Sequence, residues 1–180
     1  MKVNPVQNKI PEVIKFISGI KNKKQRDQYS LIWKIGVNYC LRANEILSLT
    51  LNQAKSGRLK QPKTGKTKDL RYLPELISLI EVYCKKYKLT GDSVLFYGYK
   101  SQPLSYQGLE FMLKKLGKAI GEKTGTHSLR KTGARIIYDK TKDTVFATQL
   151  LGHRDFGSML AYVGITDEEF QAKSKQIGLI

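Results

Sequence analysis

Hydrophobic side chains recur along most of this chain at the three-to-four-residue spacing of amphipathic helices. Such spacing gathers the apolar residues on one face of each helix and leaves the polar residues for solvent. Proline at a first turn and glycine or polar clusters after the last apolar residue mark the ends. Helices are predicted over residues 11–19, through Leu31 to Tyr39, from Pro74 to a stop signal at 90–92, from about Ser105 to Ile120, and over 127–139, 143–151, 156–163 and 167–176.

One stretch departs from this helical pattern. The segments GRLKQP (57–62) and DLRYLP (69–74) are short and flank KTGKTK (63–68), whose glycine and lysines suit a hairpin turn. They are predicted to form two antiparallel strands. No internal repeat or Pro/Ser-rich linker interrupts the chain. We therefore expect a mainly α fold with one small antiparallel β-hairpin, of the α+β class, as a single domain over 1–180 with a tail helix within 166–180.

The charge of the chain points to a polyanionic partner. Thirty-two Lys and Arg residues against fifteen Asp and Glu give a net charge of +17, more than an enzyme acting on small anions needs. No apolar run approaches the roughly 20 residues that span a bilayer, and the N-terminus lacks a signal-peptide pattern, so we expect a cytoplasmic protein. Cys40 and Cys84 lie in apolar helical patterns, which favours buried free thiols. Two histidines and two separated cysteines do not suit a metal site.

Two spacings near the end of the chain carry candidate chemistry. His127 and Arg130 are three residues apart at a predicted helix start, so both side chains emerge on the same face. His153 and Tyr162 are nine residues apart, about 2.5 helical turns, which on a straight helix would place them on opposite sides. The helix must therefore break between them. Asp155 is a suitable N-cap for a new helix that could re-aim Tyr162.

Together these motifs resemble the catalytic domain of the tyrosine recombinases, the phage integrase family. The matching residues are Arg42 with its companion acid Glu45 in LRANEIL, Lys63 in PKTGK, His127 and Arg130 in HSLR, His153 in LGH, and Tyr162 nine residues later. The interval of 23 residues between Arg130 and His153 also suits the family. The resemblance covers roughly residues 30–165. A single motif of this kind would be weak evidence, whereas several in the right order are specific.

The resemblance implies a catalytic role for each matched side chain. Tyr162 would be the nucleophile, and Arg42, Arg130 and His153 would hold the phosphate and stabilise its transition state. His127 would exchange a proton with Tyr162, and Lys63 would protonate the departing 5′ oxygen. The product would be a 3′-phosphotyrosyl enzyme, formed without metal or cofactor. The implied partners are double-stranded DNA and further copies of the chain in a tetramer.

Several assignments stay open at the level of sequence. Lys66 competes with Lys63, because counting back from Pro74 selects Lys66 as the catalytic lysine. Arg42 could instead be a surface charge that pairs with Glu45, and the two roles are compatible. Other cations are expected to contact the DNA backbone without reading sequence. These are Lys60, Lys66, Lys68, Lys131 and Arg154.

Two further questions concern the whole protein. Only about 40 residues precede Arg42, fewer than the N-terminal helical domain with which many family members clamp DNA would need. The sequence is therefore expected to be either a stand-alone catalytic domain or a catalytic domain from which the DNA-clamping half has been removed. The C-terminal tail helix could dock on a neighbouring subunit or on its own domain. The expected function is site-specific recombination or integration. A type IB topoisomerase activity and a non-catalytic DNA-binding regulator on the same scaffold are the alternatives.

Overall fold

A computed structural model describes residues 3–62 and 65–151 of the chain. Several predictions fall on residues outside this range. They are the roles of Lys63, His153, Arg154 and Tyr162, and the helices expected at 156–163 and 167–176.

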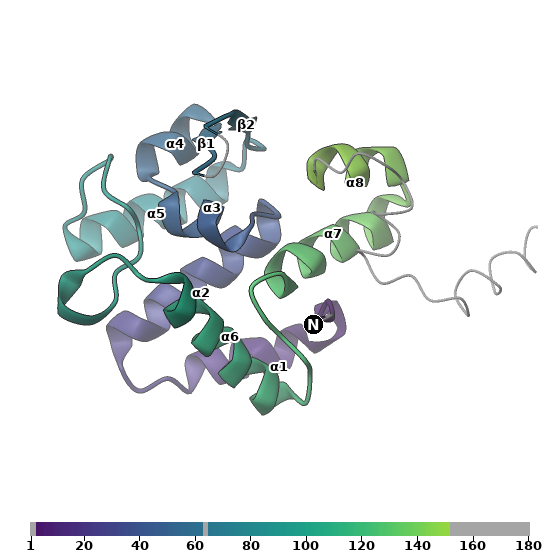
Figure 1. Cartoon of the computed structure of the whole chain (residues 1–180), viewed down its shortest axis with the longest axis horizontal. Helices are drawn as coiled ribbons and strands as arrows, with labels where there is room; N and C mark the ends of the chain where they lie inside the picture. The colour runs from purple at the N-terminus through teal and green to yellow at the C-terminus, as the bar shows by residue number, and fades with distance from the viewer. Residues whose placement is uncertain (1–2, 63–64, 152–180) are drawn as a thin grey trace, which may run out of the picture.

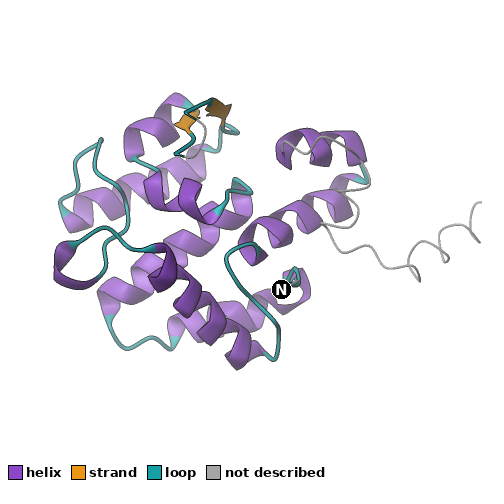
Figure 2. Ribbon diagram, viewed as in Figure 1, coloured by secondary structure: helices purple, strands orange, loops and turns teal. Residues whose placement is uncertain are grey.

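The described residues are mostly helical, with one two-stranded antiparallel sheet (Figure 2). This confirms the predicted fold class. The helices are α1 (Ile10–Ser18), α2 (Lys23–Asn38), α3 (Ala43–Ser48), α4 (Leu51–Ser56), α5 (Pro74–Tyr87), α6 (Tyr106–Ile120), α7 (Ser128–Thr141) and α8 (Thr144–Leu151), with short 3₁₀ turns at Gln7–Lys9 and Tyr99–Ser101. The strands are β1 (Arg58–Lys60) and β2 (Thr67–Asp69).

Local capping explains where several helices begin and end. The side chains of Asn22 and Ser105 accept hydrogen bonds from backbone N–H groups in the first turns of α2 and α6, at 3.0 Å in both cases. Gly121 ends α6 in the left-handed conformation that glycine adopts without strain. The sequence pattern did not predict α4. Its start is fixed by a reciprocal capping box between Thr50 and Gln53. This motif indicates a helix start even in a helix too short to show a periodic apolar pattern.

Helix α2 lies at the centre of the fold and contacts α1, α3, α5 and α7 (Figure 1). Ile32 and Ile35 on this helix are fully buried. Its approach to α7 is close enough to require glycine, because a Cβ on Gly133 would lie 2.0 Å from the carbonyl oxygen of Val37. This contact places α7, which carries Arg130, directly against the C-terminal end of α2.

The two strands are shorter than predicted, and the second shares only Asp69 with the segment expected to form it. Gln61 and Lys66 close the turn through a backbone hydrogen bond of 2.9 Å, and Gly65 has a φ of +66°. The second strand therefore starts at Thr67, two residues earlier than expected. The turn chemistry decided the register, because Gly65 supplies the left-handed residue that ends the turn. Lys68 was expected in the turn and instead lies within a strand, paired with Leu59, so this difference matters for the site.

Among the described residues, no helix combines the length and apolar character needed to cross a membrane.

Candidate active site

Arg42 is the N-cap residue directly before helix α3, and Glu45, three residues later, holds the Arg42 side chain in place. The Glu45 carboxylate accepts hydrogen bonds from the backbone N–H of Arg42 at 2.8 Å and from its Nη1 at 3.0 Å. Glu45 is 3% exposed, whereas the Arg42 side chain is 46% exposed. Burial alone would raise the pKa of Glu45, but the Arg42 amide and nearby positive charges outweigh it and lower the pKa. A charged carboxylate thus orients a guanidinium that remains accessible from solvent.

Arg130 is almost completely buried, with 1% of its surface exposed. It lies in the first turn of α7 and donates from Nη1 to the carbonyl oxygen of Cys40 at 2.8 Å and from Nη2 to that of Leu151. Cys40 precedes the Arg42 motif, and Leu151 ends α8. Arg130 therefore connects the segment that leads into α3 with the segment that leads into the LGH motif. Its charge is held in a poorly hydrated environment, where electrostatic interactions are strong.

His127 lies just before α7, and its side chain is exposed. Partial burial of the ring and the positive charges of Arg130 and Arg42 lower the pKa of His127. The imidazole is therefore neutral at physiological pH and can accept a proton. The influence of both arginines on one imidazole also shows that these three groups, predicted from distant motifs, lie near one another.

Lys68 joins this group from the hairpin. On β2 it pairs with Leu59 of β1, which is fully buried. Residues directly opposite in an antiparallel pair point to the same face, so Lys68 points inward while Thr67 and Asp69 are exposed. Its Nζ lies 3.8 Å from the Glu45 carboxylate. We call Arg42, Glu45, Lys68, His127 and Arg130 the arginine cluster.

Two residues that sequence reasoning did not select support the cluster. Gln61, directly after β1, donates from Nε2 to the Glu45 carboxylate at 3.0 Å. Arg71 donates from Nη2 to the carbonyl oxygen of Asn38 at the C-terminal end of α2, where a cation also suits the helix dipole. The hairpin and the residues that follow it are thus attached both to Glu45 and to α2. In the sequence, Gln61 could have been noticed only as a polar residue where the first predicted strand meets the turn.

The other predicted phosphate contacts occupy different environments. Lys60 and Lys66 are exposed on the hairpin. Lys131 is only 8% exposed and donates from Nζ to the carbonyl oxygen of Val3 at 3.0 Å. A phosphate contact by Lys131 would require the N-terminal segment to move. The roles proposed for Lys63, His153, Arg154 and Tyr162 concern residues that the structure does not describe.

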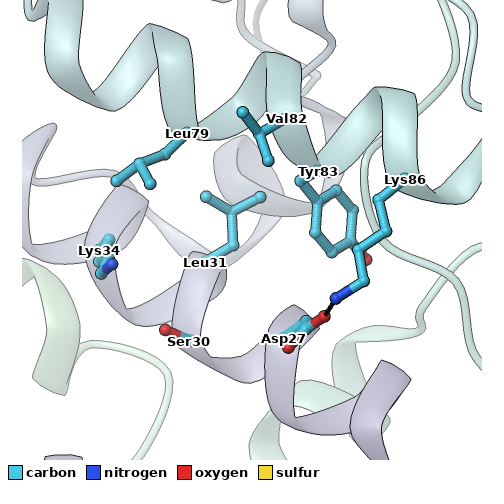
Figure 3. Close-up of a pocket in the computed structure, with 8 residues that line it drawn as sticks. All are labelled: Asp27, Ser30, Leu31, Lys34, Leu79, Val82, Tyr83 and Lys86. Atoms are coloured by element: carbon cyan, nitrogen blue, oxygen red, sulfur yellow. Dashed lines mark hydrogen bonds and ion pairs between the residues drawn. The ribbon is translucent and has the colours of Figure 1, made fainter.

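A separate surface groove lies between α2 and α5 (Figure 3). It has a volume of about 220 Å³, and Lys86 pairs with Asp27 at one end of it. The lining residues are Asp27, Ser30, Leu31, Lys34, Leu79, Val82, Tyr83 and Lys86. The groove shares no residue with the arginine cluster. Its lining mixes apolar side chains with the Lys86–Asp27 ion pair and holds none of the matched motifs, so the candidate active site is the cluster.

The arginine cluster can bind and polarise an anion. Arg42 and Lys68 lie beside the Glu45 carboxylate, and Arg42 and Arg130 both act on His127. Guanidinium groups match the geometry of phosphate oxygens. Among the described residues, no group of three or more His, Cys, Asp or Glu side chains is arranged to hold a metal ion. The side chains of the arginine cluster can supply electrostatic stabilisation and proton transfer.

Comparison with known proteins identifies the family. The chain matches the model of the phage integrase family over residues 7–169. It is 30% identical over 181 residues to the probable integrase/recombinase YoeC of Bacillus subtilis, covering 98% of this chain and 97% of that protein. It is 26% identical over 159 residues to the tyrosine recombinase XerA of Saccharolobus solfataricus, covering 86% of this chain but 52% of that protein.

Solved structures show the same fold. A crystal structure of XerA recombinase superposes with a TM-score of 0.75 at 19% identity, covering all of this chain and 66% of the other. The XerH site-specific recombinase, in a post-cleavage complex with its palindromic difH substrate, also gives 0.75 at 22% identity, covering 96% and 52%. The family model spans most of the sequence, and the resemblance seen in its motifs is thereby confirmed: the chain belongs to the phage integrase family.

Proposed function

We propose that this protein is a site-specific DNA recombinase, or integrase, that cleaves and rejoins duplex DNA through a covalent 3′-phosphotyrosyl intermediate. The observation that carries the proposal is that Arg42, held by the buried Glu45 carboxylate, and Arg130 both act on the imidazole of His127, although these groups come from separate motifs. Family membership and the DNA complexes among the related structures support the same substrate class.

The reaction would begin with a phosphodiester held against the arginine cluster. Arg42 is accessible to a phosphate oxygen, and the buried charge of Arg130 adds to the attraction. The phenolic oxygen of Tyr162 would then attack phosphorus. With an ordinary pKa near 10, a phenol needs a base, and the neutral imidazole of His127 can take its proton. His153 would donate a further hydrogen bond to the phosphate.

The wider interface would be formed by cations around this centre. We propose Lys60, Lys66 and Arg154 as contacts to the DNA backbone, which would supply affinity without sequence readout. The +17 charge of the chain suits this role. Recombination joins two sites, so we further propose that four copies act together on DNA, in the cytoplasm.

The proposal can be tested by trapping the covalent intermediate. Nicked suicide duplexes that contain a randomised segment lose a short strand after cleavage, so the adduct cannot religate. Adducts recovered under denaturing conditions and sequenced would give the cleavage site as well as the activity. We expect a wild-type adduct at one recurring sequence and none with Tyr162→Phe. An adduct that survives Tyr162→Phe would refute the assignment of the nucleophile.

The same assay separates the alternative functions. A DNA-binding regulator would bind duplex DNA but would give no adduct with any suicide substrate. A type IB topoisomerase would give adducts and would relax supercoiled plasmid without producing recombinant products from paired sites. Recombinant products from a plasmid with two copies of the recovered site would support the proposed function over both.

A further inference from the structure

The loop that precedes His127 is attached to helix α6 by a tyrosine. The chain runs from the end of α6 at Ile120 to α7 through residues 121–127 (Figure 1). Tyr106 is the first residue of α6, and its hydroxyl shares a hydrogen bond of 2.8 Å with the hydroxyl of Thr126. Thr126 is 8% exposed and directly precedes His127. The start of α6 is thus joined to the residue beside the proposed base.

Other contacts fix the earlier part of this loop. Lys123 is attached to the N-terminal segment through a backbone hydrogen bond of 3.1 Å. The hydroxyl of Thr124 donates to the carbonyl oxygen of Leu113 in the middle of α6. Gly125 is held through its backbone N–H, which donates to the Ser128 hydroxyl at 3.1 Å. These contacts hold the loop without the tyrosine, so removing the hydroxyl of that tyrosine should leave the fold intact.

The hydroxyl of Tyr106 is not needed to start α6. The Ser105 side chain already caps that helix by accepting a hydrogen bond from the backbone N–H of Gly108 at 3.0 Å. Tyr106 is 40% exposed, so much of its ring lies outside the core. Its polar tip nevertheless reaches a buried hydroxyl, and a hydrogen bond of this kind fixes the position of its partner. The bond therefore constrains Thr126 and, through one peptide unit, His127.

From these contacts we infer that Tyr106 is a positioning residue for His127, and that it sets the place of the imidazole relative to the arginines through Thr126. The inference rests on the proposed function and deepens it, because neither the motifs nor the family resemblance selected this tyrosine. A base accepts a proton only within hydrogen-bonding distance, about 2.6–3.2 Å between heavy atoms. A displacement of about 1 Å can cost as much as roughly 100-fold in rate. A hydroxyl that holds the adjoining residue can therefore control cleavage without contacting DNA.

The charges around His127 give this positioning a measurable signature. Partial burial of the ring lowers the pKa of His127, and the charges of Arg130, Arg42 and Lys131 lower it further. Arg42 lies before α3 and the other two cations lie on α7, so each effect depends on where the loop holds the ring. An imidazole released from this place is better hydrated and less affected by the arginines, so its pKa moves up towards the ordinary value of about 6.5. The base is then lost to protonation at a higher pH.

Removing single hydroxyl groups tests this inference. Tyr106→Phe and Thr126→Val each remove one side of the bond with little change in shape, and Thr126→Ser keeps the hydroxyl as a conservative variant. Tyr29→Phe is the matched control, because the Tyr29 hydroxyl accepts a hydrogen bond from Nε2 of Gln25 at 3.1 Å within α2. The measurement is the single-turnover rate of adduct formation, followed against pH, on a suicide duplex that carries the site recovered with the wild type.

We expect Tyr106→Phe and Thr126→Val each to slow cleavage by roughly 10-fold, below the largest loss that misplacement of a reacting group causes. In both variants the fall in rate at low pH should begin at a higher pH than in the wild type. Because both changes break the same bond, the double variant should be no slower than the slower single variant. Thr126→Ser should restore most of the rate that Thr126→Val loses, and Tyr29→Phe should keep the wild-type rate and pH dependence.

Several outcomes would contradict the inference. An unchanged rate in Tyr106→Phe would show that the bond does not matter for cleavage. A slower rate with the wild-type pH dependence would show that the bond only stabilises the fold, and losses that add in the double variant would show that the two hydroxyls act separately. Thermal unfolding checks each variant. Failure of both single variants to fold would also overturn the inference, because the bond would then be needed for the fold rather than for His127.

A second measurement does not depend on DNA cleavage. The chain has two histidines, so the proton NMR signal of the His127 ring can be assigned by comparison with His127→Gln and followed against pH in the free protein. We expect the midpoint of this titration to be higher in Tyr106→Phe than in the wild type, and an unchanged midpoint would overturn the inference. Failure of the recombinase proposal looks different, because the wild type would then form no adduct while the shift of the His127 midpoint would remain.

Discussion

Replacing Gly133 with alanine should force apart the two helices that hold the arginine cluster. The new Cβ would lie 2.0 Å from the carbonyl oxygen of Val37 and 2.7 Å from the sulfur of Cys40. Real Cβ contacts are essentially never shorter than 3.0 Å, so α7 would have to move about 1 Å from α2. A gap of that size forfeits a quarter to a half of each dispersion contact across the interface.

The expected cost is about 3 kcal/mol, at the upper end of the range for overpacked cores, because a backbone atom limits the space. For a protein of this size that is a fall in Tm of about 6–12 °C. Circular dichroism during thermal and urea unfolding would measure it. Gly19→Ala is the matched control, because its Cβ would make ordinary contacts at 3.5 Å, and it should leave Tm nearly unchanged.

Two further observations would test the cause. Adding Cys40→Ala to Gly133→Ala should not restore stability, because the limiting clash is with the carbonyl of Val37. Adduct formation should also fall, because movement of α7 separates Arg130 from the carbonyl of Cys40. A Gly133→Ala protein that loses less than about 1 kcal/mol, well below the expected overpacking cost, would show that this interface is not tightly packed and would refute the reasoning.

Three other measurements probe the site. Glu45→Gln removes the charge that orients Arg42, so the single-turnover rate of adduct formation should fall roughly 10- to 100-fold. This fall equals an increase of about 1.4–2.7 kcal/mol in the activation free energy. An unchanged rate would show that the carboxylate is not needed for cleavage. The pKa of His127 is lowered, so the cleavage rate of the wild type should stay level until the pH falls to about 6.5, the ordinary pKa of histidine, and should decline only below that pH. His127→Gln should lose this decline. A midpoint above about pH 7 in the wild type would contradict the assignment. Lys60→Ala and Lys66→Ala should each reduce the slope of log affinity for duplex DNA against log salt concentration by about 0.9, and equal slopes would place these lysines away from the DNA backbone.

Much of the fold could be predicted from the sequence because the long helices have strong periodic patterns. The helix from Pro74 and the one from Ser105 began within one residue of their predicted positions. The short helix α4 was missed because six residues hold too few apolar positions to show a period. The hairpin was predicted, but its register was not, because the KTGKTK segment allows several turns and only the folded chain selects the one that ends at Gly65.

The site was partly predictable for a similar reason. The three-residue spacing of His127 and Arg130 placed both on one helix face, and the resemblance to the family joined Arg42 to them. The inward direction of Lys68 depends on pairing with Leu59, which is a tertiary choice. Likewise, Lys131 follows Arg130 in sequence and seemed a surface cation, but the N-terminal segment covers it. Contacts between segments that are far apart in the chain produce no local sequence pattern, so they could not be predicted from the sequence.

The buried sulfur of Cys40 has a practical consequence for studying this molecule. The thiol is fully buried where α2 approaches α7, donates to the carbonyl of Val37, and has its pKa raised by burial. An alkylating reagent can therefore reach it only while the two helices transiently part. The rate of labelling at Cys40, measured by peptide mass, would report how often α2 and α7 separate, and how much added duplex DNA slows that separation.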